Sequence, residues 1–237
     1  MRLSLFALGA ALSAPALPAH AAPACVRPGD LAPAPVLVPP ADEVVTGVTN
    51  AFYLLSLNWT PQWCRTMGVG TTAQKMECDQ PFGFTLHGLW PNGATKPYPR
   101  FCRPVGGLGA STVIEMYCRT PSPELLQHEW QAHGACGWRD AKAYFSQAAR
   151  LYDRVVMPKI ESIAPGALTA GAVRAAFVGR NPWLRADEIY VQTTRSQELS
   201  EVRLCYDLKF NPTACPGGTG APDGVHIRLA PSRSGAF

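Results

Sequence analysis

Three histidines and one glutamate in this chain have the types and spacing that acid-base chemistry needs. His87 lies in the segment FTLHGLWPN, and His128, Glu129 and His133 lie in HEWQAHGAC. Two imidazoles can share one reaction, one as general base and the other as general acid. Attack of an RNA 2′-hydroxyl on its neighbouring phosphate suits them. A neutral imidazole removes the 2′ proton, and an imidazolium protonates the departing 5′ oxygen.

Two other catalytic arrangements fit the sequence less well. A zincin needs histidines at i and i+4, whereas His128 and His133 are at i and i+5, about 140° apart around a continuous helix. The cysteines show no CxxC pair, which argues against a structural zinc site. A Ser-His-Asp hydrolase of the nucleophile-elbow type would carry G-x-S-x-G, which is missing. The sequence therefore predicts no metal and no cofactor.

The amino terminus predicts export. Residues 1–21 read MRLSLFALGAALSAPALPAHA, with Arg2, a short apolar stretch and Ala19-His20-Ala21 as a cleavage site. The apolar stretch is shorter than the roughly 20 residues that span a bilayer. We expect a cleaved signal peptide, no membrane anchor, and a periplasmic or secreted product. Residues 22–50 form a Pro- and Ala-rich extended lead-in, followed by one domain at 51–237.

The composition supports a folded domain. Of 237 residues, 47% are hydrophobic and 16% are charged, which excludes a disordered chain. The formal charge of +4 leans mildly toward anionic partners, but the arginines form no dense run. In an oxidising compartment we expect disulfides among the eight cysteines, which are Cys25, Cys64, Cys78, Cys102, Cys118, Cys136, Cys205 and Cys215.

Hydrophobic periodicity and capping residues predict the elements that hold these side chains. Strands are predicted at 51–58, 82–89, 188–194, 200–207 and 224–229. Helices are predicted from Ser122 to Gly134, from Asp140 to Pro158, and over 169–178. Residues 60–81 and 91–122 are predicted as loops. Since no βαβ alternation is present, the predicted class is α+β, a central antiparallel sheet with packed helices.

The two histidine segments resemble the two active-site segments of the ribonuclease T2 family. FYLLSLNWTPQWC, AYF, and VRLCYD with Cys215 extend the resemblance over most of residues 51–216. The resemblance implies an α+β, disulfide-stapled fold and a secreted endoribonuclease of broad base tolerance. Its substrate would be single-stranded RNA and not DNA, cleaved to 2′,3′-cyclic phosphates and then to 3′-phosphates. We expect a monomer.

The resemblance also implies a role for each residue of the two segments. His133 would be the general base, His87 the general acid, and His128 the phosphate-holding residue. Glu129 would assist charge stabilisation, and its i, i+4 spacing to His133 puts both on one helix face.

Three further residues match the family's base-binding positions. Trp90 and Tyr98 would stack a base, which suits sequence-tolerant binding. Asn92 stands where relatives often carry Asp, so base preference would differ from theirs.

One position departs from the family pattern. The residue before the second-segment histidine is usually Lys, but here it is Ala132. Losing one such donor typically costs about 10²-fold in rate or more. Another cation could replace the lysine, and the candidates are Arg100, Arg103, Arg119 and Arg139. The alternative is a T2-like RNA-binding protein with weak or lost turnover.

The disulfide partners follow partly from proximity and partly from the family. Proximity favours Cys205 with Cys215. The family pattern suggests Cys118 with Cys136, and the set would then be completed by Cys64 with Cys78 and Cys25 with Cys102.

Overall fold

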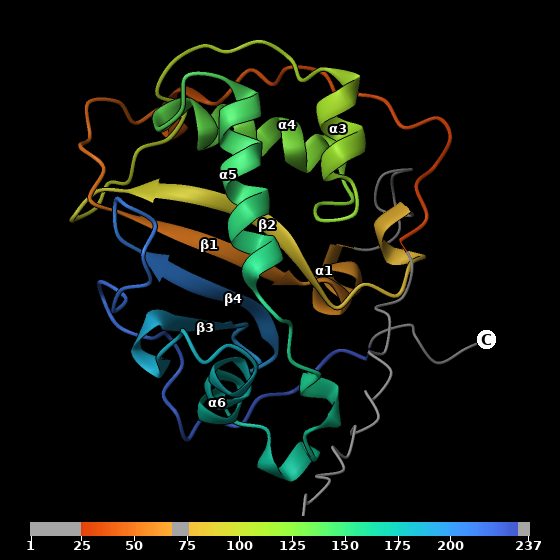
Figure 1. Cartoon of the computed structure of the whole chain (residues 1–237), viewed down its shortest axis with the longest axis vertical. Coiled ribbons are helices and arrows are strands. Elements are labelled where there is room, and N and C mark those ends of the chain that lie inside the picture. Colours follow the sequence, from red (N-terminus) through yellow and green to blue (C-terminus); the bar gives the residue numbers. More distant parts are fainter. Residues whose placement is uncertain (1–24, 68–75, 232–237) are drawn as a thin grey trace, which may run out of the picture.

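The computed structural model describes residues 25–67 and 76–231 of the chain. In this part lies a four-stranded antiparallel sheet with the order β2–β1–β4–β3 (Figure 1). The strands are β1 (Phe52–Trp59), β2 (Phe84–Asn92), β3 (Ile189–Thr193) and β4 (Leu199–Tyr206). The predicted α+β class is therefore confirmed. The predicted signal at 1–21 lies outside the described residues.

Helices cover the sheet. They are α1 (Thr60–Met67), α3 (Ala110–Met116), α4 (Pro123–Ala132), α5 (Ala141–Arg154) and α6 (Ala170–Arg180). Short 3-10 turns occur at Ala41–Glu43, Gly134–Cys136, Ile160–Ser162, Pro165–Ala167 and Ala186–Glu188. In Figure 1, α5 runs across β1 and β2, with α3 and α4 beside it, while α6 packs on β3. No helix in the described ranges is long and apolar enough to cross a membrane.

Side-chain caps start three of these helices at the predicted places. Each cap accepts a hydrogen bond from the backbone N–H three residues ahead, which satisfies a donor that the first turn leaves free. The caps are Ser122, Asp140 and Thr169. The sequence therefore located these helix starts correctly.

The sheet has an apolar face and a polar face. Successive strand side chains point to opposite sides, and the apolar side of β1 consists of Tyr53, Leu55, Leu57 and Trp59 in the core. Ser56 and Asn58 point to the other side. Their cross-strand partners on β4 are Arg203 and Glu201, respectively. The polar face of the sheet thus collects charged side chains from neighbouring strands.

Three predicted segments differ from the structure. The predicted loops 60–81 and 91–122 contain α1 and α3, because short amphipathic turns after Thr60-Pro61 and Gly109 pack against neighbours despite weak sequence signals. The strand predicted at 224–229 is absent from that described segment. It makes only isolated bridges, His226 with Thr169 and Arg228 with Glu198, because it passes a helix start and a turn rather than a strand.

Four disulfides staple the described chain. The pairs are Cys25–Cys118, Cys64–Cys78, Cys102–Cys136 and Cys205–Cys215. The two short-range pairs are confirmed, and the pairings Cys118–Cys136 and Cys25–Cys102 are wrong. The cause is a long-range contact: the Phe101 N–H donates to the Ala132 carbonyl at 2.9 Å, which brings Cys102 to the end of α4 beside Cys136. Sequence distance carries no information about such a contact.

Candidate active site

His87 is positioned by a β-bulge in β2. Ser56 pairs with Gly88 and Leu57 pairs with Leu86, so His87 is the extra residue between two regular pairs. A bulge re-aims the side chain of the extra residue. The His87 side chain is 25% exposed and reaches over the polar face toward β4, where Nδ1 lies 2.7 Å from Oε1 of Glu201.

Glu129 is buried against the same bulge. Its Oε2 accepts a hydrogen bond from Trp90 Nε1 at 2.8 Å, and its Oε1 lies 3.5 Å from Nε2 of His87. Position 88 must be glycine here, because a Cβ would collide with the Glu129 carboxylate. Burial raises the pKa of Glu129 to about 7, against the opposing influence of His87 and Trp90. The contacts of Glu129 thus face His87 and Trp90.

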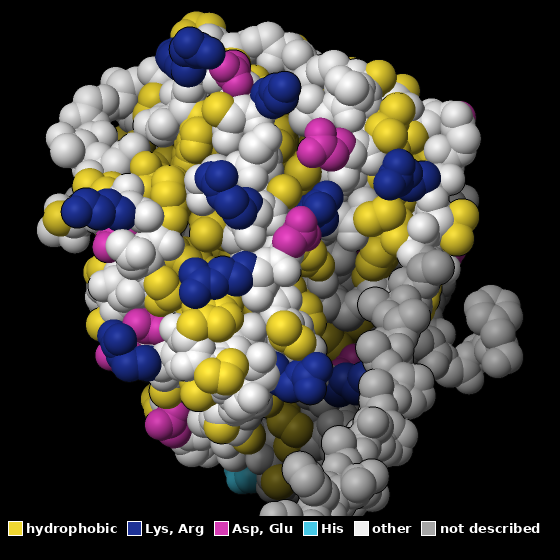
Figure 2. Space-filling model, viewed as in Figure 1, with side chains coloured by type: hydrophobic (Ala, Val, Ile, Leu, Met, Phe, Trp, Pro, Cys, Tyr) yellow, Lys and Arg dark blue, Asp and Glu magenta, His cyan; other side chains and the backbone are white. Residues whose placement is uncertain are grey.

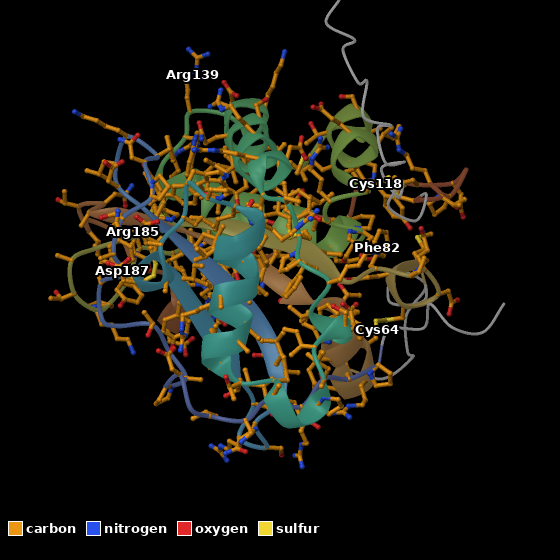
Figure 3. All side chains as sticks on the ribbon, turned by 60° about the horizontal axis from the view of Figure 1, so that its bottom comes forward. Cys64, Phe82, Cys118, Arg139, Arg185 and Asp187 are labelled. Carbon is orange, nitrogen blue, oxygen red and sulfur yellow. A yellow bond between two sulfur atoms is a disulfide. The ribbon has the colours of Figure 1, made fainter. Side chains whose placement is uncertain are left out.

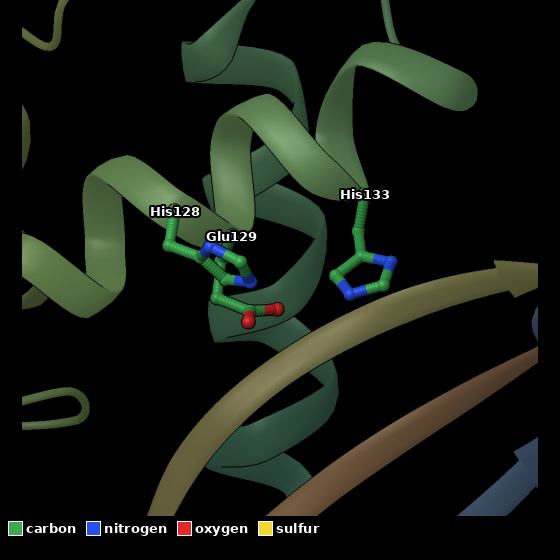
Figure 4. Close-up of side chains that lie close together, drawn as sticks. All are labelled: His128, Glu129 and His133. Atoms are coloured by element: carbon green, nitrogen blue, oxygen red, sulfur yellow. The ribbon is translucent and has the colours of Figure 1, made fainter. Parts of the chain in front are cut away.

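His133 lies where helix α4 ends. It is the residue after Ala132, with φ −121° and ψ −46°, so it has left helical geometry. The tight turn that follows needs Gly134, whose Cβ would collide with the Trp130 ring and come within 2.9 Å of Tyr144. As Figure 4 shows, His128, Glu129 and His133 all project from this end of α4 on its β2 side.

The ending of α4 changes the metal argument. Each of His128, Glu129 and His133 offers a ligand atom, and these three atoms lie within 4.8 Å of one another. The spacing argument assumed a continuous helix, and α4 stops one residue before His133. Two imidazoles and a carboxylate are donors that Zn²⁺ accepts. The spacing argument therefore does not exclude a metal at this cluster.

The environments of the histidines separate their proton affinities. Burial disfavours the imidazolium of His87, but the hydrogen bond to Glu201 and the nearby Glu129 carboxylate outweigh it, so its pKa is raised. Burial, His128 and Arg100 hold the pKa of His133 well below its usual range. Opposed shifts of this kind mark a general acid and a general base. His87 retains a proton under conditions in which His133 is neutral.

Arg100 is the arginine that the structure brings to the histidines. A terminal guanidinium nitrogen lies 3.4 Å from Nε2 of His128 and 2.9 Å from the Glu43 carboxylate. Both backbone hydrogen bonds between Arg100 and Val45 fix the segment. Burial and Arg100 together lower the pKa of His128. Ala132 is fully buried and its carbonyl binds the residue after Arg100, so Arg100 lies beside the position that lacks a lysine.

The other candidate arginines are engaged elsewhere. Arg119 forms a two-pronged ion pair with Asp153. Arg103 donates to the carbonyls of Trp138 and Arg139. Arg139 is 95% exposed and projects outward from the molecule (Figure 3). The structure thus ranks four candidates that the sequence left unranked.

The three predicted base-binding residues are not gathered equally. The Trp90 ring centroid lies 5.0 Å from that of His87 and 5.3 Å from that of His133. Asn92 is buried and its amide donates to the Trp90 carbonyl at 2.9 Å. Tyr98 is exposed and packs edge-on against Phe52, at the end of β1 that pairs with Asn92. Trp90 is central, whereas the other two lie toward the strand end.

Sequence reasoning missed Glu201 and Arg203. Arg203 donates to Oε2 of Glu201 at 2.6 and 2.8 Å, and its guanidinium lies 4.9 Å from the Trp90 ring centroid. With His87, both residues line a cleft of about 320 Å³. The only signal in the sequence was the i, i+2 spacing of two charges in a predicted strand, which places them on one face but names no partner.

Comparisons with known proteins agree with these features. A sequence model of the ribonuclease T2 family matches residues 50–215. A "Probable ribonuclease" of Haemophilus influenzae is 27% identical over 176 residues, covering 69% of this chain and 60% of that protein. A "Ribonuclease" of Aeromonas hydrophila is 34% identical over 85 residues, covering 36% and 37%. The chain thus spans less than two thirds of these relatives. The solved structure of trichomaglin, described as an S-like ribonuclease, has a TM-score of 0.59 at 18% identity, covering 75% of this chain and 97% of that one.

Proposed function

This chain belongs to the ribonuclease T2 family, and from that premise we propose that it is an endoribonuclease that cleaves single-stranded RNA. It works without a metal or cofactor and with broad base tolerance, forming 2′,3′-cyclic phosphates and then 3′-phosphates. The observation that carries the proposal is the opposed pKa shift of two histidines beside one tryptophan, His133 downward and His87 upward.

The proposed reaction assigns one proton to each histidine. Neutral His133 takes the proton of the 2′-hydroxyl, and the 2′ oxygen bonds to phosphorus. The bond from phosphorus to the 5′ oxygen breaks, and His87 gives that oxygen its proton. Opening of the cyclic phosphate runs in reverse, with water in place of the 5′-hydroxyl. His128 holds the phosphate, and Glu129, whose pKa of about 7 lets it exchange a proton near neutrality, assists beside it.

Arg100 supplies the positive charge in the absence of the family's lysine. Its 3.4 Å separation from Nε2 of His128 supports this role, because both groups can bind the same phosphate. A cation at this place stabilises the charge that develops on the pentacovalent phosphorus. Ala132 is therefore compatible with turnover.

Aromatic stacking accounts for the broad base tolerance. Trp90 offers a ring beside the reacting histidines, and every base has a face that can stack on it. Asn92 and Tyr98 adjust base preference from the strand end. On the face in Figure 2, Lys and Arg side chains are dispersed among apolar and acidic ones, which supports modest electrostatic attraction of RNA on that side.

The protein acts outside the cytoplasm as a monomer. The predicted signal peptide at 1–21 and four disulfides support a periplasmic or secreted location, because disulfides persist in oxidising compartments. DNA is not a substrate, since the reaction uses the 2′-hydroxyl as its nucleophile.

The test compares single-stranded RNA with DNA of the same sequence, in EDTA, from pH 4 to 8. We expect cyclic-phosphate ends from RNA alone, their loss in His133→Ala, and normal cleavage in the control His226→Ala, an exposed histidine that pairs with Thr169. RNA that is bound but not cut would instead identify an RNA-binding protein. Cleavage abolished by EDTA would point to a metal at the three-residue cluster.

A further inference from the structure

We propose that Glu201 is a positioning residue that fixes the ring of His87 for proton donation, and that Arg203 holds Glu201 in place. The proposal deepens the ribonuclease activity proposed above and rests on it. The contacts that carry it are a 2.7 Å approach of Glu201 Oε1 to His87 Nδ1 and two hydrogen bonds from Arg203 to Oε2.

The sheet brings these groups together across a strand. His87 is on β2 and Glu201 is on β4, with β1 between them. The bulge pushes the His87 side chain over β1, where the neighbouring position on the polar face is the small Ser56. No large β1 side chain intervenes at Ser56, so the imidazole reaches the carboxylate directly.

The contact determines which nitrogen of His87 is free to react. A carboxylate at Nδ1 favours a proton on Nδ1 in both charge states. In the charged ring, Nε2 then carries the proton that goes to the 5′ oxygen. In the neutral ring, Nε2 has a free lone pair, which can take a proton from water when the cyclic phosphate opens. One fixed tautomer therefore serves both steps.

Arg203 keeps the carboxylate charged and oriented. Each oxygen of Glu201 has its own partner, Oε1 with His87 and Oε2 with Arg203. Although burial opposes ionisation, His87 and Arg203 lower the pKa of Glu201 to about 2. The Arg203 guanidinium also lies over Trp90, 4.9 Å from the ring centroid, and so ties this pair to the proposed base-stacking ring.

The proposal is tested by changing the leaving group of the substrate. A dinucleoside phosphate expels an alkoxide and needs a proton donor, whereas a nucleoside 3′-(4-nitrophenyl phosphate) expels a stable phenolate and does not. We expect Glu201→Gln to lower kcat on the dinucleotide by about 10 to 10² fold and on the aryl ester by less than about threefold. The control Glu198→Gln, a carboxylate paired with Arg65 just before β4, should change neither. Equal losses on both substrates, or none, would overturn the proposal.

A second measurement does not depend on turnover or on any variant. Nitrogen NMR of the ¹⁵N-histidine-labelled wild-type protein reports which nitrogen of neutral His87 is protonated, with His87→Ala identifying the signal. We expect the Nδ1–H form, and a neutral ring protonated at Nε2 would refute the role of Glu201. If the wild type shows this tautomer but cleaves neither substrate, the ribonuclease proposal fails while the positioning contact stands.

Discussion

Replacing Arg100 with alanine should slow the reaction strongly, because this residue stands in for the missing lysine. Its guanidinium lies 3.4 Å from His128 Nε2. At an effective dielectric constant of about 20, unit charges about 4 Å apart interact by about 4 kcal/mol, which corresponds to roughly 10³ in rate. The Arg100 side chain is 35% exposed and shares its charge with Glu43, so solvent and that ion pair reduce the effect. We expect kcat/KM to fall by about 10² fold.

The assay is steady-state cleavage of a dinucleoside phosphate by wild type, Arg100→Ala, Ala132→Lys and the double variant. In wild type, Ala132→Lys should gain less than about threefold, because Arg100 already supplies the charge. In the Arg100→Ala background the same lysine should restore about tenfold or more. Arg139→Ala, which removes an exposed arginine, is the matched control and should behave as wild type.

The pH profile gives an independent check on Arg100. Arg100 is among the charges that lower the pKa of His133, so its removal should raise that pKa. Because the general base must be neutral, the acid limb of kcat/KM should move to higher pH. An Arg100→Ala enzyme with unchanged kcat/KM and an unmoved acid limb would refute the assigned role.

Three further predictions follow from the site and its surroundings. In wild type, kcat/KM should fall on the acid side below pH 6.5 as His133 gains a proton, and on the alkaline side above pH 6.5 as His87 loses one; a single limb would contradict the assignment. Trp90→Ala should raise the KM for RNA by about tenfold through lost stacking, and an unchanged KM would exclude that role. Burial raises the pKa of Glu77 to about 7, so folding with this carboxylate loses stability as the pH rises from about 4.5 to 7. Glu77→Gln should therefore stabilise the protein by about 3 kcal/mol at pH 8 and by almost nothing at pH 4, measured by denaturant unfolding; equal effects at both pH values would contradict the shift.

The amino-acid sequence by itself determined the local features. The caps Ser122, Asp140 and Thr169 predicted helix starts, because a capping hydrogen bond involves only three or four consecutive residues. The strands around His87 and Glu201 were predicted from apolar runs and alternation, and these gave the correct α+β class. The histidine segments predicted the chemistry from their residue types.

Only the tertiary structure decided which distant groups meet. Glu201 reaches His87 because a bulge and a strand order place them on one face, and no spacing in the sequence encodes that register. Arg100 reaches His128, and Cys102 reaches Cys136, through one backbone contact at the end of α4. Local patterns depend on neighbours along the chain, whereas these contacts depend on how every element packs, and that packing sets the charge around each catalytic group.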